Sequence, residues 1–123
     1  MNNEVMNKSI THIKSKAFAI RIVRFYRHMT EVKKEYVLSK QILRSGTSIG
    51  ANVRESFSAQ SKADFISKLS IALKEADETG YWLELLVESD YIDRTEYDSL
   101  NNDLKEVAAL IASSVKTAKN NNS

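Results

Sequence analysis

The sequence predicts an all-α protein, an antiparallel up-down four-helix bundle. The first observation is turn chemistry: the 123 residues contain no proline and only three glycines. Sheets of short strands need glycine and proline at close intervals, whereas long helices need neither. The second is composition, because 42% hydrophobic and 28% charged residues are typical of a folded domain with its own core. The third is the spacing of apolar residues, which follows the helical period along four segments.

The first helix is predicted from about Ser9, its N-cap, to about Met29. Its core face has the spacing i, i+4, i+7, i+11 and consists of Phe18, Ile22, Phe25 and Met29. A second apolar strip lies on the other side of its first half and consists of Ile10, Ile13, Ala17 and Ile20. We expect residues 9–119 to form the bundle domain, and residues 1–8 and 120–123 to be disordered polar ends.

The second helix is predicted over about residues 36–57, with a core side made of Leu38, Ile42, Ile49, Val53 and Phe57. Gly46 and Gly50 lie beside this side, four residues apart. Glycine inside a helix costs about 1 kcal/mol relative to alanine. The pair therefore predicts close approach by another helix. A phosphate-binding loop is the alternative, but no Gly-Lys-Ser/Thr sequence follows.

The third helix is predicted to begin at a capping box, Ser61 to Asp64, and to end at about Ser89. Its core stripe consists of Phe65, Leu69, Ala72, Ala76, Leu83 and Val87. A second apolar strip on another side contains two glutamates. Because a four-helix monomer covers one face of each helix, this strip predicts an oligomer interface, made of Ile71, Glu75, Glu78, Trp82 and Leu85.

The fourth helix follows a short link over residues 90–93, and its start signal is predicted at Thr95 to Asp98. Its apolar stripe consists of Tyr97, Leu100, Leu104, Val107, Ala108, Ile111, Val115 and Ala118. Long helices joined by short links pack antiparallel with their neighbours in sequence. This pattern completes the predicted bundle.

No catalytic centre is recognisable. The residues three before His12 and His28 are Ser9 and Phe25, so the Glu-x-x-His motif of di-iron bundles is absent. The sequence has no zinc-binding histidine motif, no nucleophile elbow and no cysteine. We expect a non-enzyme without metal, cofactor or small-molecule substrate. With no apolar leader and no run long enough for a membrane span, we expect a cytoplasmic protein that does not contact membranes.

The charge is distributed unevenly along the chain. Residues 1–62 hold twelve Lys/Arg and four Asp/Glu, a net charge of +8, whereas residues 63–123 have a net charge of −6. Two basic stripes follow the first two helices; they contain Lys14, Arg21, Arg24 and Arg27, and Lys40, Arg44 and Arg54. Arginines at helical spacing can contact successive phosphates, which predicts nucleic-acid binding. The alternatives are ion pairs with the acidic third and fourth helices, or simple solvation.

Two segments resemble the signature of a known bacterial family of four-helix bundles. The first is Tyr36-Val-Leu-Ser-Lys-Gln-Ile-Leu-Arg-Ser-Gly-Thr-Ser-Ile-Gly-Ala-Asn-Val-Arg-Glu55. The second is Asp64-Phe-Ile-Ser-Lys-Leu-Ser-Ile-Ala-Leu-Lys-Glu-Ala-Asp-Glu-Thr-Gly-Tyr-Trp-Leu-Glu-Leu-Leu86, followed by Ser89-Asp-Tyr-Ile92. The family comprises proteins encoded in intervening sequences of 23S ribosomal RNA genes and is often labelled the S23 ribosomal protein family. The resemblance covers about residues 9–119.

This resemblance implies a homopentameric ring of four-helix bundles. The chain is also similar to the accessory protein of diversity-generating retroelements, which implies work with RNA and a reverse transcriptase. The positions that match the family pattern, for which structural or subunit-contact roles are implied, are Ser48, Asn52, Glu55, Glu75 and Glu78. We expect a homo-oligomer that binds structured RNA, or an RNA-processing protein, through the basic stripes. The alternative is a protein-interaction adaptor in which the charge asymmetry serves subunit docking.

Overall fold

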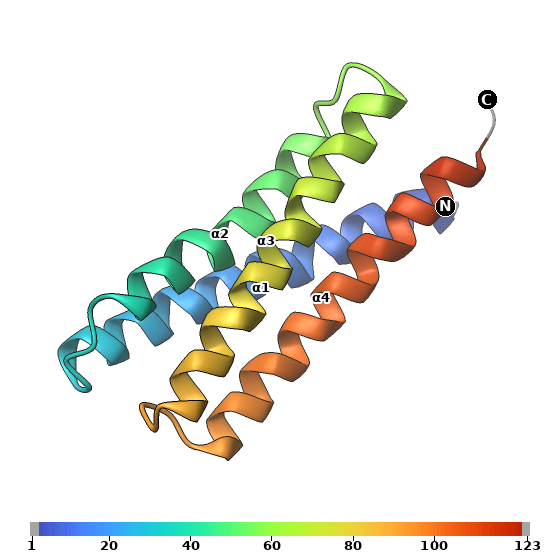
Figure 1. Ribbon diagram of the computed structural model, residues 1–123. Helices are drawn as coiled ribbons and strands as arrows, with labels where there is room; N and C mark the ends of the chain where they lie inside the picture. The colour runs from blue at the N-terminus through green and yellow to red at the C-terminus, as the bar shows by residue number, and fades with distance from the viewer. Residues whose placement is uncertain (1–2, 122–123) are drawn as a thin grey trace.

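The computed structural model describes residues 3–121, which form four α-helices and, within that range, no β-strand (Figure 1). The helices are α1 (Asn3–Glu31), α2 (Leu38–Ser56), α3 (Lys62–Glu88) and α4 (Arg94–Asn120). The predicted all-α class with four helices is confirmed. Over the same residues, none of the helices combines the length and the apolar character that a membrane span requires.

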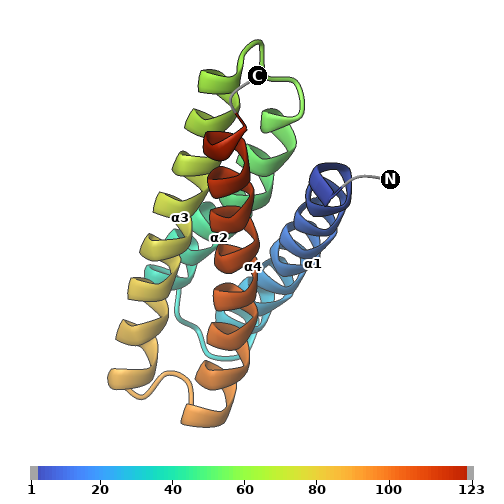
Figure 2. The same ribbon diagram turned by 90° about the vertical axis from the view of Figure 1, so that its right-hand side faces the viewer.

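The helices are joined at alternating ends, so that each runs back alongside the one before it (Figures 1 and 2). α2 packs against α1 and α3, and α4 packs against α3 and α1. The contact between α2 and α3 is the most extensive of the four, and that between α1 and α4 is the smallest. Figure 1 shows α1 inclined to the other three helices.

The core follows the predicted apolar stripes except at Leu86, at Phe57 and at Ile92, which is buried although it lies in the link between α3 and α4. Its fully buried members include Ile22, Ile49, Leu83 and Ile111, one from each helix. Leu86 is also fully buried, although it lies outside the predicted stripe, because α3 packs between α2 and α4 and buries a face wider than one stripe.

The placement of Phe57 in the core is the wrong prediction: its side chain is 43% exposed. α2 ends at Ser56, so Phe57 lies beyond the helix and its ring stacks edge-on against His12, with 5.6 Å between the ring centroids. The helical stripe therefore does not continue to this residue.

The predicted close approach at the two glycines of α2 is confirmed. A Cβ atom built on Gly46 would lie 3.0 Å from the side chain of Ile22. One built on Gly50 would lie 3.2 Å from the backbone carbonyl oxygen of Ser15. Both contacts are to α1, so the absence of side chains at these two positions lets α1 and α2 pack at short range.

The helix ends correct two predictions. The hydroxyl of Ser61 accepts a hydrogen bond from the amide of Asp64 at 3.0 Å, as predicted for α3. The N-cap of α4 is Asp93, two residues before the predicted signal at Thr95, and its carboxylate accepts a hydrogen bond from the amide of Glu96 at 2.8 Å. α1 begins at Asn3 rather than Ser9, since no glycine or proline interrupts it, and a formed helix propagates readily. Residues 3–8 are thus helical, while residues 1–2 and 122–123 lie outside the described range.

The start of α2 depends on a buried glutamate. The carboxylate of Glu35 accepts hydrogen bonds from the backbone amides of Val37 at 3.0 Å, Leu38 at 2.8 Å and Ser39 at 2.7 Å. Burial disfavours the charged form, but these hydrogen bonds outweigh it and hold the pKa of Glu35 below its ordinary value. The helix therefore begins at Leu38, two residues after the predicted start at Tyr36.

Candidate nucleic-acid interface

The seven cations predicted to bind nucleic acid divide into two groups. Three of them, Lys14, Arg21 and Arg44, form ion pairs within the chain. The other four are exposed and form no ion pair with any residue that the structure describes; they are Arg24, Arg27, Lys40 and Arg54. The sequence left open ion pairing and solvation as alternatives to nucleic-acid binding. In the structure, three of the seven cations form ion pairs and the other four are exposed to solvent.

Two of the paired cations join α1 to α4. The Lys14 Nζ atom lies 3.0 Å from Glu106 Oε1. The Arg21 guanidinium lies 2.5 Å from Asp103 Oδ2 and also donates to Ser99, at 2.7 Å to its hydroxyl and 3.2 Å to its carbonyl oxygen. These contacts are on the surface, where an ion pair contributes about 0–1 kcal/mol. They hold α1 against α4 through two of the carboxylates of α4.

The third paired cation joins α2 to α3. Arg44 donates to Glu75 at 3.3 Å and to Glu78, which also accepts a hydrogen bond from the indole nitrogen of Trp82 at 3.2 Å. The basic residue that faces these two glutamates is therefore Arg44 of the same chain. Both carboxylates are thus engaged in contacts within the chain.

The predicted oligomer strip on α3 is partly covered by the chain's own side chains. Trp82 and Leu85 are half-buried, and the Trp82 ring lies 5.2 Å from the Tyr81 ring. Ile71, at 39% exposed, is the most open apolar residue of the strip. Glu75 and Glu78 are held by Arg44, as described above. The exposed apolar part of this strip is consequently small.

Exposed cations gather where α1 leads into α2. We call this surface the basic end; its members are Arg24, Arg27, Lys33, Lys34 and Lys40. Lys33 and Lys34 were missed from the sequence because they lie in the link rather than on a helical stripe, although their adjacency was visible. Of the two carboxylates in the same stretch, Glu31 is exposed and Glu35 is buried in the cap of α2. Arg54 lies near the other end of α2, outside the basic end.

Carboxylates border the basic end on one side. The link between α3 and α4 lies at the same end of the molecule as the link between α1 and α2 (Figures 1 and 2). It carries exposed Asp90 and Asp93 and follows exposed Glu88. Positive charge is therefore concentrated at the link between α1 and α2, and negative charge at the neighbouring link between α3 and α4.

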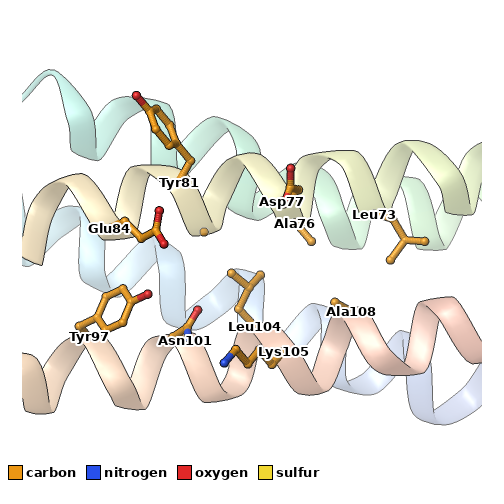
Figure 3. A pocket seen from close by; sticks show the side chains of 11 residues that line it. Leu73, Ala76, Asp77, Tyr81, Glu84, Tyr97, Asn101, Leu104, Lys105 and Ala108 are labelled. Carbon is orange, nitrogen blue, oxygen red and sulfur yellow. The ribbon is translucent and has the colours of Figure 1, made fainter.

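The described residues contain no cluster of three or more His, Cys, Asp or Glu side chains that could hold a metal ion. A groove of about 560 Å³ lies between α3 and α4 (Figure 3). Its walls combine apolar side chains such as Leu73 and Leu104 with the carboxylates of Asp77 and Glu84. Figure 3 shows Leu73 and Leu104 between the two helices.

Known proteins resemble this chain in sequence and in fold. The family model described as 23S rRNA-intervening sequence protein matches residues 7–113. A crystal structure of a protein with unknown function from the S23 ribosomal protein family of Bacteroides thetaiotaomicron is 56% identical, with a TM-score of 0.88. The similarity covers 89% of this chain and 98% of that chain. No curated protein matches the sequence. The family resemblance noted in the helix-two and helix-three segments is thereby confirmed: the chain belongs to the 23S rRNA-intervening sequence protein family.

Proposed function

We propose that this protein is a non-enzymatic RNA-binding protein, a homo-oligomeric ring of up-down four-helix bundles that holds structured RNA at the basic end. The observation that carries the proposal is the set of five exposed cations within residues 24–40, none paired with a described carboxylate. Such cations neutralise phosphates without first breaking an ion pair. The name of the family refers to 23S rRNA, which makes RNA the first partner to test.

The proposal assigns the predicted cations two different roles. Arg24, Arg27 and Lys40 bind RNA together with Lys33 and Lys34, and Arg54 forms a separate contact at the far end of α2. The paired residues Lys14 and Arg21 hold α1 against α4, and Arg44 holds α2 against α3. Their substitution would weaken these helix contacts as well as change the charge.

The test is a fluorescence-anisotropy titration of a labelled RNA hairpin at several salt concentrations. The variant carries Arg24→Glu, Arg27→Glu and Lys40→Glu. The matched control carries Lys74→Glu, Lys116→Glu and Lys119→Glu, the same charge change at exposed positions on α3 and α4. Each lost phosphate contact lowers the slope of log affinity against log salt by about 0.7–0.9.

The expected result is a slope smaller by about 2 to 3 in the basic-end variant and a nearly unchanged slope in the control. Equal binding by the two variants would place the interface elsewhere. Absence of binding by the wild type at low salt would end the RNA proposal.

A protein-interaction adaptor is the second candidate. It is favoured by the carboxylates of residues 88–93 beside the basic end, because opposite charges at one end suit a protein with its own charge pattern. In that case the wild type would fail to bind RNA at low salt while still assembling, and light scattering on the same sample separates this outcome from a misfolded chain.

A further inference from the structure

Gly80 differs from the other two glycines, because the described chain does not require it. It lies in the interior of α3, where glycine costs about 1 kcal/mol relative to alanine. A Cβ atom built there would have Leu104 Cδ2 as its nearest neighbour, at 3.6 Å, which is ordinary van der Waals contact. At Gly46 and Gly50 the same atom would be crowded by α1. Close approach from outside the chain would explain why position 80 has no side chain.

Gly80 lines the groove between α3 and α4. The apolar part of the groove is formed by the half-buried residues Leu73, Gly80 and Ala108, above the buried side chains of Ala76 and Leu104. Its polar lining includes the exposed carboxylates of Asp77 and Glu84 and one cation, Lys105. The groove therefore fits a ridge of apolar side chains flanked by positive charge.

Such a ridge lies on α1. The α1 strip (Ile10, Ile13, Ala17, Ile20) is spaced i, i+3, i+7, i+10, and its isoleucines are 40%, 61% and 44% exposed in chain order. No other helix of the described chain covers these side chains. Exposed Lys14 and Lys16 lie within the strip's length, and Lys16 forms no ion pair with a described residue. An apolar ridge flanked by cations thus faces solvent on α1, whereas the charged lining of the groove is mostly carboxylate.

We propose that the α1 strip of one copy docks into the α3–α4 groove of a second copy, with Lys16 facing Asp77 and Glu84. The inference rests on the self-association in the proposed function and names its contact surfaces. Because strip and groove are different surfaces, the contact is head-to-tail, which is the type of contact that builds a ring when the rotation between copies closes. The α3 strip containing Ile71 is the competing contact surface.

The absence of cysteine makes a cross-linking test clean. Single variants Ile13→Cys, Tyr81→Cys and Ile71→Cys are purified, mixed in pairs by co-refolding, and oxidised. The proposal predicts a disulfide-linked dimer in the Ile13→Cys and Tyr81→Cys mixture, and none in either variant alone. Cross-linking of Ile13→Cys to itself, or preferentially to Ile71→Cys, would overturn the proposed pairing, as would no cross-link in an assembled mixture.

Light scattering after size exclusion gives the second readout. Ile13→Glu places a charge in the apolar contact, and Gly80→Gln fills the groove. Each is expected to weaken assembly at least about tenfold and to shift the protein towards its monomer mass of 13.9 kDa, with the circular-dichroism melting curve retained. Ile71→Glu serves as the matched control and should leave the assembly intact.

The outcomes separate this inference from the proposal on which it rests. If Ile71→Glu dissociates the assembly while Ile13→Glu and Gly80→Gln do not, self-association stands and the strip-to-groove contact is wrong. A monomeric wild type would overturn both. RNA affinity is measured separately, by the titration described above.

Discussion

Arg44 joins α2 to α3 and Arg21 joins α1 to α4, each through an ion pair, but the two ion pairs lie in different surroundings. Arg44 holds Glu75, whose side chain is 17% exposed, and beneath it the fully buried hydroxyls of Ser45 and Thr79 lie 2.8 Å apart. Arg21 holds Asp103, whose side chain is 50% exposed. Burial strengthens a polar contact and raises the cost of removing one partner.

The hydroxyl pairs differ in the same direction. Between α1 and α4, the hydroxyls of Thr11 and Ser114 are 3.5 Å apart, which is long for a hydrogen bond between oxygens. The comparison indicates that α2 and α3 form the more stable part of the molecule. α1 depends less on α4 than on its close packing against α2 through the two glycines. An ion pair joins α1 to α4 and another joins α2 to α3, but the burial around each ion pair decides how stable the helix contact is.

The largest expected effect comes from separating α1 from α2. Gly50→Val would force a branched side chain against the Ser15 carbonyl and should lower the free energy of unfolding by about 1–3 kcal/mol. Urea denaturation measures the change. Gly80→Ala is the matched control, because its Cβ fits, and it should be neutral or stabilise by up to about 1 kcal/mol. Equal destabilisation by both would mean that helix propensity, not packing, governs these positions.

The next effect comes from the cap that begins α2. Glu35→Gln removes the charge that three amides stabilise, and a lost cap costs about 0.5–2 kcal/mol. The folded-state pKa of Glu35 lies below the unfolded value of 4.5. Its contribution is therefore complete above about pH 4.5 and is lost as the pH falls through the folded pKa. Denaturation at neutral and acidic pH checks this: the gap between wild type and variant should close in acid. A gap that stayed constant would contradict the role of the charge.

The smallest effects compare the two hydroxyl pairs directly. Thr79→Val leaves the buried Ser45 hydroxyl without its partner and should cost about 1 kcal/mol, whereas Ser114→Ala should cost less than about 0.5 kcal/mol. Paired urea titrations measure the difference. Equal losses would show that the two helix contacts are equally firm, against the comparison above.

Much of the fold was predictable because burial repeats at the helical period, as at Ile22, Ile49 and Ile111. The close contact at Gly46 and Gly50 was predictable because their helical cost needs a compensating approach. The ion-pair partner of each arginine was not predictable. A stripe indicates the helix face on which Arg44 lies, but it does not indicate that Glu78 of the same chain pairs with it. The cap by Glu35 was not predicted, because its carboxylate reaches the first amides of α2 only through the turn that the chain makes between α1 and α2.

The central claim is that paired cations hold the helices together while unpaired cations bind RNA. The most direct measurement is the salt dependence of RNA affinity for two double variants, Arg24→Gln with Arg27→Gln and Lys14→Gln with Arg21→Gln. The first should lose about 1.5–2 from the slope of log affinity against log salt, and the second should keep the wild-type slope. An equal loss in both variants, or a loss confined to the second, would contradict the division.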